Sequence, residues 1–556
     1  MLGPLIRTTM EAGSNLRVAR DDAVWSFLLP KMDVHEAWVV GDVPAGICAG
    51  LRDRAVRLVH VDDIGQLLAR GQHVPIELLV LTSAGLARPG ESNGDAAAQI
   101  RALLAIDASV VVTGTAGSST VAALGRLLGH QPQVATMQPA PRPGRLRGAP
   151  DQTALRVPVR RQRSRARRRL RSAANMSSAG IARALGHTTP LPWVRSHASD
   201  LQPLTPRAGS DRSRGGVLIA TRRGSDQAAL PLWVQQAGSA AGLDWHAAAW
   251  RFAPPRGYRS QKPIFLVGAD EEGASEYVVK VTQEPRFNDR LLNEAHALRH
   301  LAATRLVPVG EVPEVRSMAE HAGLAVVVES FCPGSPFRRW STGRADCRHA
   351  ARAVEWFTLL GERSAVHTTS ADALRRDSET LVRRFTECFP MNPGYVAKLQ
   401  EHAAQLTEAA PPAVFLHGDP GVWNLLTRPD GRIAVLDWEN AVVEGPPCWD
   451  LLLLLTSYAA FAGEAAGRRP TARQIALQFA VGSPLRPLIE AAFAHYGERV
   501  GLSAATMESL IVLCFAHQAL KELSRLPHRA TPATHSSELL ARVLDAPVLT
   551  GSPLRA

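Results

Sequence analysis

The sequence predicts two folded units, an amino-terminal α/β domain and a carboxy-terminal α+β unit with a small mixed lobe and a large helical lobe. Short apolar runs alternate with helix-like stretches over residues 1–135, which is typical of α/β domains. Beyond residue 245, strand-like runs come first and helices follow, which favours an α+β arrangement. A chain of 556 residues is also too long to fold around one core.

The amino-terminal unit is expected to contain a parallel sheet. One helix is predicted over residues 95–105, and strands are predicted over residues 37–40, 58–61, 77–81 and 109–112. Strands that alternate with helices are usually joined by crossover connections, which make neighbouring strands parallel. The unit is therefore predicted to be Rossmann-like.

A glycine turn in this unit has the spacing of a nucleoside site. Gly41 follows the first predicted strand, and Asp62 ends the second, where a Rossmann-like domain places the acid that binds ribose hydroxyls. The pattern weakly resembles class I S-adenosylmethionine-dependent methyltransferases, whose first motif carries more glycine than Gly41 and Gly46 supply. Two alternatives stay open: a domain that binds S-adenosylmethionine, and an α/β domain without a working cofactor site.

Residues 136–215 are rich in Pro, Arg, Ser and Gly, which predicts a linker or insertion. Twelve arginines and one acid lie within residues 141–171, so this segment supplies most of the net charge of +12. The run Arg160–Arg171 lacks the interleaved aromatic residues of a base-stacking platform. A solvated linker is one interpretation, and contact with an acidic surface or nucleic acid is the other.

The second unit is expected to occupy residues 216–556. Strand-like runs cover residues 216–220, 248–252, 263–267, 276–281 and 324–329, with a predicted helix at 288–303. Nearly everything after Gly334 is helical in pattern, apart from residues 413–437. We therefore predict a small lobe with a lead-in segment over residues 216–334, and a helical lobe over residues 335–556.

The cysteine pattern and the apolar runs favour a cytoplasmic protein. Six cysteines are scattered without a CxxC pair, which disfavours a zinc site and a disulfide framework. The first residues lack an apolar stretch of signal-peptide length. The most apolar run, residues 451–455, is far shorter than the ~20 residues of a membrane-spanning helix.

Residues 413–450 carry the most informative motif. An apolar run over residues 413–416 precedes His417, Gly418 and Asp419, and Asn424 follows five residues after the aspartate. A predicted turn at residues 429–431 folds the chain into a hairpin that ends at Asp437. We expect the hairpin to bring Asp419, Asn424 and Asp437 to one edge.

These residue types suit phosphoryl transfer from a nucleotide. One carboxylate orients the attacking hydroxyl and accepts its proton, while an amide oxygen and a second carboxylate bind Mg²⁺ against phosphate oxygens. Oxygen ligands are those that Mg²⁺ prefers, whereas zinc sites are built from His and Cys. The sequence therefore predicts a phosphotransferase centre that uses ATP and Mg²⁺.

The motif HGD-x4-N with a following DWE resembles the aminoglycoside phosphotransferase and choline kinase family, which has a protein-kinase-like fold. The resemblance covers about residues 245–525. It implies that Asp419 is the catalytic base, that Asn424 and Asp437 bind Mg²⁺, and that His417 supports the loop. It also implies that Asp450 is a buried aspartate that braces the loop.

The small lobe contains the further residues that such a fold requires. Lys280 lies in the predicted strand EYVVKV, and Glu294 follows on an amphipathic helix, as expected for a lysine that binds phosphates and the glutamate that holds it. By resemblance, backbone groups of Glu329 to Phe331 form the hinge that binds adenine. The phosphate-covering turn is expected within residues 253–261, which contain Gly257 as their one glycine.

The predicted function is an ATP-dependent small-molecule kinase that phosphorylates a hydroxyl group, as in aminoglycoside phosphotransferases. Two alternatives stay open: a kinase-like ATP-binding scaffold without turnover, and a bifunctional protein whose first domain binds S-adenosylmethionine. The acceptor pocket is expected near residues 457–463 and 510–522, with Glu464 and Glu522 as candidate contacts. Amino sugar, choline-like alcohol, nucleoside and hexose remain possible acceptors.

Overall fold

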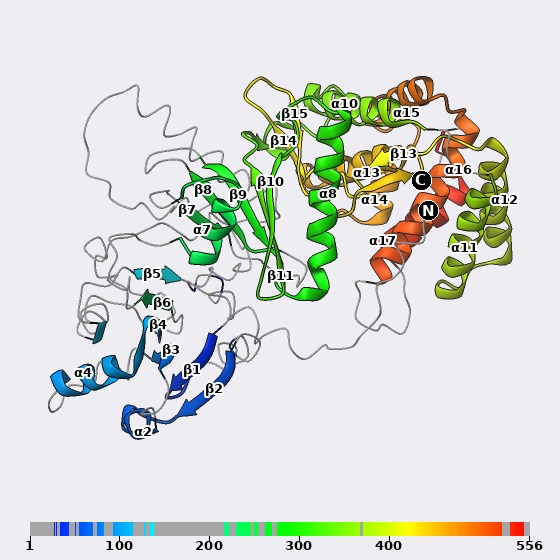
Figure 1. Ribbon diagram of the computed structural model, residues 1–556. Helices are drawn as coiled ribbons and strands as arrows, with labels where there is room; N and C mark the ends of the chain where they lie inside the picture. The colour runs from blue at the N-terminus through cyan, green and yellow to red at the C-terminus, as the bar shows by residue number, and fades with distance from the viewer. Residues whose placement is uncertain are drawn as a thin grey trace.

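A computed structural model gives the fold of the chain (Figure 1). The described residues are 27, 29, 34–43, 51, 55–70, 75–82, 93–114, 127–128, 134–137, 216–221, 230–245, 250–253, 262–268, 275–366, 371–524, 534–546 and 548–549. Of the predicted linker over residues 136–215, residues 138–215, with the arginine run, lie outside them, whereas residues 136 and 137 belong to a strand.

The amino-terminal unit contains a six-stranded sheet with the order β2-β1-β3-β4-β6-β5. Strands β1 to β4 are parallel, and β6 runs antiparallel to both β4 and β5. The strands are β1 (Val34–Val40), β2 (Ala55–Val61), β3 (Ile76–Thr82), β4 (Leu104–Gly114), β5 (Val134–Met137) and β6 (Gly216–Thr221). Helices α2 (Ile64–Arg70) and α4 (Asn93–Leu103) lie between them in the chain. The expected parallel strands are thus present.

The position of β6 corrects the predicted start of the second unit. Residues 216–220 were assigned to the lead-in of the small lobe, but β6 pairs with β4 and β5 and is part of the first sheet. Of its two partners, β4 lies more than 100 residues earlier in the chain and β5 lies on the other side of the predicted linker. The apolar pattern of β6 alone could not reveal either partner. The first unit therefore extends beyond the predicted linker.

The small lobe of the second unit is a five-stranded antiparallel sheet with the order β10-β11-β9-β8-β7. Its strands are β7 (Trp250–Ala253), β8 (Ile264–Gly268), β9 (Ser275–Val281), β10 (Val315–His321) and β11 (Leu324–Ser330). Helix α7 (Leu232–Ser239) precedes the sheet, and the short η4 (Pro285–Phe287) leads into helix α8 (Asn288–Thr304). The α8 side chains Leu291 and Ala295 pack on Ala325 and Val327 of β11.

The large lobe is mostly helical (Figure 1). Its helices are α9 (Phe337–Trp340), α10 (Arg348–Ser364), α11 (Ala371–Cys388), α12 (Pro393–Ala409), α13 (Trp449–Ala465), α14 (Ala472–Phe479), α15 (Arg486–Val500), α16 (Ala504–Leu523) and α17 (His535–Asp545). The short strands β12 (Ser335–Pro336), β14 (Leu425–Thr427) and β15 (Ile433–Val435) form one small sheet, and β13 (Val414–Leu416) pairs with β16 (Val442–Gly445). His417, Asp419, Asn424 and Asp437 lie in the segments beside the ends of these short strands.

Two large apolar clusters hold these parts together. One fills the helical lobe, where the indole of Trp438 and the ring of Phe415 are fully buried beside the HGD motif. The other contains Val39 of β1, Trp233 of α7 and Phe265 of β8, so it joins residues of the first sheet to the small lobe. Burial of such large side chains is the main source of folding free energy.

No single helix within the described ranges is long and apolar enough to cross a membrane. Helices α15 and α16 meet the length and composition test only as a pair, with a bend of 110° between them.

Candidate active site

Strand β13 delivers the HGD motif to a loop at the centre of the large lobe. The His417 ring is buried, and its Nε2 donates to the carbonyl of Leu436 at 2.9 Å. Its Nδ1 accepts from the backbone N–H of Asp419 at 3.1 Å, so both ring nitrogens are used in hydrogen bonds to the backbone. His417 therefore supports the loop, as the sequence resemblance implied, and does not point into the cleft as a base.

Gly418 is required in this loop for two reasons. Its φ of +77° lies in the left-handed region, which side chains other than glycine rarely adopt. A Cβ at this position would also lie 2.1 Å from the carbonyl oxygen of Asn440. The loop therefore approaches the segment after Asp437 more closely than any other residue would allow.

Asp450 braces the loop from below, as predicted. It lies at the start of α13, is buried, and accepts from the backbone N–H of His417 at 2.6 Å and of Gly418 at 3.0 Å. Burial raises the pKa of this carboxyl, while the two N–H groups and His417 act in the opposite direction. The contacts satisfy backbone donors that would otherwise be buried without a partner.

The β14–β15 hairpin brings Asn424 and Asp437 to the same loop. The Asn424 side chain donates from Nδ2 to the carbonyl of Asp419 at 2.8 Å, and the Leu436 N–H donates to the Asn424 carbonyl at 2.9 Å. Asp437 follows directly with a φ of +65°, a conformation that Asp tolerates better than most residues. The structure thus places the three predicted residues around one edge.

The donor set at this edge fits a Mg²⁺ ion. Because Nδ2 of Asn424 is used by the Asp419 carbonyl, the amide oxygen is the end of that side chain left for a cation. Asp437 adds a carboxylate whose pKa is lowered to about 2, because Lys262 and Lys280 outweigh the effect of burial. Hard oxygen ligands of this kind suit Mg²⁺. No group of three or more His, Cys, Asp or Glu side chains with metal-binding geometry occurs among the residues that the structure describes.

The predicted Lys280–Glu294 ion pair is present in the small lobe. Nζ of Lys280 lies 2.6 Å from Glu294 Oε1 and 2.7 Å from Glu329 Oε2, and all three side chains are buried. Burial opposes the charge on Lys280, but the two carboxylates outweigh it and raise the pKa of the lysine. Burial raises the pKa of Glu329 to about 7 despite its contact with Lys280.

Sequence reasoning missed Lys262, which lies just before β8. Its Nζ contacts Asp437 Oδ1 at 2.7 Å, Glu294 Oε2 at 2.9 Å and Glu439 Oε2 at 2.9 Å. Strand alternation places Lys262 on the face of the sheet that also carries Ile264, which pairs in register with Lys280. This shared face was the one sequence signal that could have pointed to Lys262. It is a weak signal, because many surface lysines have the same position in a strand pattern.

The predicted hinge, Glu329 to Phe331, leads from the end of β11 toward the large lobe. The Glu329 side chain points into a cluster formed by Lys262, Lys280 and their carboxylate partners, which we call the lysine cluster. The Phe331 N–H donates to the carbonyl of Glu276 at 2.7 Å, so the hinge continues the sheet pairing by one more hydrogen bond.

Two small apolar clusters flank the hinge. Ile264, Leu266 and Val278 of the small lobe pack with Phe331 on one side. On the other side Cys332 packs with Leu426, Ala434 and Leu436 of the large-lobe hairpin. These two clusters are separate from the two large apolar clusters. Ile264 of the first pairs in register with Lys280, and Leu436 of the second directly precedes Asp437.

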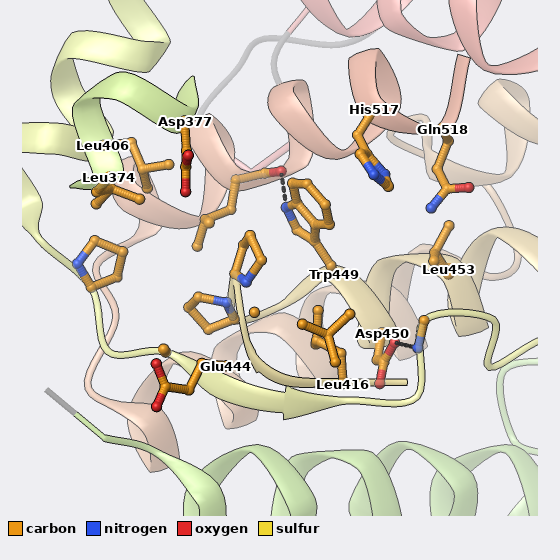
Figure 2. Close-up of a pocket in the computed structure, with 18 of the residues that line it drawn as sticks. Leu374, Asp377, Leu406, Leu416, Glu444, Trp449, Asp450, Leu453, His517 and Gln518 are labelled. Atoms are coloured by element: carbon orange, nitrogen blue, oxygen red, sulfur yellow. Dashed lines mark hydrogen bonds between the residues drawn. The ribbon is translucent and has the colours of Figure 1, made fainter. Parts of the chain in front are cut away.

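A cavity of about 70 Å³ lies beside the catalytic loop (Figure 2). Its wall contains Gly418 of the loop, Leu374 and Asp377 of α11, Glu444 of β16, and His517 of α16. The lining is mainly apolar, and burial together with Lys521 lowers the pKa of His517 to about 3, so this ring is neutral. The carboxylates of Asp377 and Glu444 lie on one side of the view and His517 and Gln518 on the other.

The two acids considered as acceptor contacts have structural partners instead. Glu464 pairs with Arg338 of α9, and Glu522 accepts from the backbone N–H and the hydroxyl of Ser536 at the start of α17. Of the two expected pocket segments, 510–522 contributes to the cavity wall through four residues, and 457–463 is not part of that wall.

Several predictions fall outside the described residues. The phosphate-covering turn with Gly257 lies in the gap 254–261, apart from Ala253 at the end of β7, and Gly46 lies in the gap 44–50. The arginine run Arg160–Arg171 also lies outside.

Residues 252–488 match the model of the phosphotransferase enzyme family. This span includes the lysine cluster, the catalytic loop, Asn424, Asp437 and Asp450. Among curated proteins, none matches the chain.

Matches to solved structures cover about half of this chain and most of the length of those chains. Aminoglycoside phosphotransferase APH(3'')-Id from Streptomyces rimosus, in complex with ADP and streptomycin, is 19% identical over 49% of this chain and 90% of its own, with a TM-score of 0.31. Macrolide 2'-phosphotransferase MphH from Brachybacterium faecium is 18% identical over 57% and 98%, with a TM-score of 0.34. Choline kinase LicA from Streptococcus pneumoniae is 13% identical over 54% and 93%, with a TM-score of 0.34.

Proposed function

We propose that this chain, whose carboxy-terminal half belongs to the phosphotransferase enzyme family, transfers the γ-phosphoryl group of ATP to a hydroxyl group of a small molecule. The observation that carries the proposal is the convergence of Asp419, Asn424 and Asp437 on one edge, opposite the paired Lys280 and Glu294. Phosphoryl transfer needs positioned charges more than covalent chemistry, and this set supplies them.

Asp419 is the proposed catalytic base. Its carboxylate would orient the acceptor O–H and take its proton as the new O–P bond forms and the bond from the γ-phosphorus to the β-phosphate oxygen breaks, which releases ADP. Both ring nitrogens of the neighbouring His417 already have backbone partners, which leaves this task to Asp419.

The remaining residues would bind the phosphates. Mg²⁺, held by the Asn424 oxygen and Asp437, would neutralise charge on the phosphate oxygens. Lys280, which is kept in place by Glu294, would pair with the α- and β-phosphates. Adenine would lie between the two apolar clusters that flank the hinge, with Ile264 above and Leu426 below.

The cavity beside Gly418 is the proposed acceptor site. It adjoins the catalytic loop, and most of its wall comes from α11, α16 and the segment around β16. Apolar walls with a few placed polar groups are typical of small-molecule sites. Asp377 and Glu444 would favour an acceptor that carries hydrogen-bond donors or a positive charge.

An ADP-release assay on the full chain tests the proposed activity. ATP and Mg²⁺ are supplied with sugars, amino alcohols, nucleosides, macrolides or aminoglycosides in turn, and Asp430→Ala on the exposed hairpin turn serves as a folded control. We expect acceptor-dependent ADP release by the wild type and by this control. ATP binding without ADP release across the panel would instead favour a scaffold.

For the first domain, we propose a Rossmann-like fold whose boundary with the small lobe lies after β6. The parallel order β2-β1-β3-β4 supports it, as does the turn at Gly41, where the N–H donates to the carbonyl of Val61. Asp62 directly follows β2 and accepts from Nε2 of Gln66 at 3.1 Å. Calorimetric titration of the full chain with S-adenosylmethionine tests whether this edge binds a nucleoside, and no detectable heat would argue for a domain without a cofactor.

A further inference from the structure

Lys262 occupies the place between the lobes where a metal and phosphates would meet. It belongs to the small lobe, yet its ammonium group contacts Asp437 and Glu439 of the large lobe as well as Glu294 of α8. The Lys262 side chain is only 8% exposed. A buried lysine is costly unless it is paired, so these three contacts define its position.

The lysine cluster is short of positive charge. Lys262 and Lys280 bring two positive charges, and Glu294, Glu329, Asp437 and Glu439 bring four negative charges when all are ionised. One carboxylate oxygen of Glu329 is buried without a hydrogen-bond partner among the described residues. With all groups ionised the net charge of the cluster is therefore −2, which a divalent cation would neutralise.

Lys262 and a metal ion on Asp437 compete for the same carboxylate. Nζ of Lys262 lies 2.7 Å from Asp437 Oδ1. A Mg²⁺ ion bound to that oxygen at ~2.1 Å would lie less than ~5 Å from the ammonium group, where two cations repel each other strongly in a buried site. Lys262 would then need another anionic partner within its reach.

From this geometry we propose that Lys262 is a second phosphate-binding lysine, which rests on the metal-binding carboxylates until Mg²⁺ and nucleotide arrive. The inference rests on the proposed phosphotransferase function. Lys262 shares a face of the small-lobe sheet with Ile264 and Lys280, so release from Asp437 leaves its ammonium group beside the phosphates that Lys280 would bind. In the free protein it holds the two lobes together across the cleft.

The affinities of the Lys262→Met variant for metal and for nucleotide, compared with those of the wild type, test this role. The variant keeps the length and apolar stem of the side chain and removes the charge. Binding of Mn²⁺ without nucleotide, followed by electron paramagnetic resonance, should become about tenfold tighter, because the competing ammonium group is gone. Calorimetry with a non-hydrolysable ATP analogue at saturating Mg²⁺ should show about tenfold weaker binding, because one phosphate contact is lost.

Controls separate this role from a structural one. Lys398→Met removes a lysine that donates to the Leu544 carbonyl far from the site, and it should change neither affinity. Lys262→Arg keeps the charge and should restore nucleotide binding toward the wild-type value. Should Lys262→Met unfold, as judged by near-ultraviolet circular dichroism, Lys262→Gln is subject to the same two expectations.

Two results would overturn the inference. Mn²⁺ binding by Lys262→Met that is equal to or weaker than wild type would show that Lys262 does not compete with metal. Unchanged binding of the ATP analogue would show that it does not contact phosphate. If the wild type binds nucleotide and releases ADP while the variant matches it, this inference alone fails. A wild type that does neither refutes the proposed function itself.

Discussion

The backbone N–H of His417 donates to the buried carboxylate of Asp450 at 2.6 Å, which ties the catalytic loop to the first turn of α13. The neighbouring Gly418 N–H donates to the other oxygen at 3.0 Å. The loop is thus fixed from below by a side chain that takes no part in the proposed chemistry, and its geometry depends on that side chain.

Replacement of Asp450 should destabilise the large lobe. Asp450→Ala would leave two buried N–H groups without their acceptor, and we expect a loss of about 2–4 kcal/mol in unfolding free energy. Denaturant unfolding followed by tryptophan fluorescence measures this loss. Asp372→Ala on the exposed surface of α11 is the matched control and should stay within about 0.5 kcal/mol of wild type. Equal stability of the two variants would contradict the bracing role.

Gly418 and Gly467 form a matched pair, because both have positive φ but different surroundings. A Cβ on Gly418 would meet the Asn440 carbonyl at 2.1 Å, whereas a Cβ on Gly467 would meet nothing within 4 Å. Gly467→Ala should therefore cost only about 1 kcal/mol of stability, from backbone strain. Gly418→Ala should cost at least about 2 kcal/mol and abolish ADP release, because the loop must move. Comparable thermal unfolding temperatures for the two variants would refute the close approach.

The raised pKa of Glu329 predicts a pH-dependent stability. Since the folded-state pKa is about 7 and the ordinary value is 4.5, the folded protein binds a proton more tightly than the unfolded chain. This carboxyl therefore lowers stability as the pH rises from about 4.5 to 7, by a few kcal/mol at most. Glu329→Gln should become more stable relative to wild type between pH 5 and pH 8, as measured by thermal unfolding. The exposed Glu320→Gln should show no such trend, and a trend of the same size there would contradict the assignment.

The acceptor site can be tested by filling the cavity. Leu374→Trp on α11 places a larger side chain in its wall and should raise the KM for the acceptor by about tenfold or more, because the pocket is shortened. The dissociation constant for Mg-ATP, measured by calorimetry, should stay within about twofold, since the nucleotide lies elsewhere. Arg376→Trp on the exposed side of the same helix is the control. An unchanged KM for the acceptor in Leu374→Trp would place the acceptor outside this cavity.

The sequence pattern was enough to predict contacts between residues that lie in the same loop or in consecutive elements. Lys280 and Glu294 pair as expected because a strand and the following helix fix their directions. The contact of Asp450 with the loop, 33 residues away at His417, was implied by the family resemblance and not by local pattern. Asn424 reaches the Asp419 carbonyl because the two residues are only five apart in one tight loop.

Long-range partners could not be predicted in the same way. The burial of Lys262 depends on Glu294 and Asp437, which are 32 and 175 residues away in the chain. Strand β6 enters the first sheet between β4 and β5, across a long linker, although its apolar run looks like that of the following strands. The Phe331 amide pairs with Glu276 for a similar reason, because strand register decides which hinge donors remain.

The central claim is that Asp419 is the base of a phosphotransferase, and the kinetics of Asp419→Ala test it most directly. With the best acceptor from the screen, kcat should fall by about 10³-fold, while the dissociation constant for Mg-ATP stays within a few-fold of wild type. Asp430→Ala, at the exposed turn of the β14–β15 hairpin, should keep full activity. If Asp419→Ala retains more than about a tenth of the wild-type kcat, Asp419 is not the base and the account is wrong.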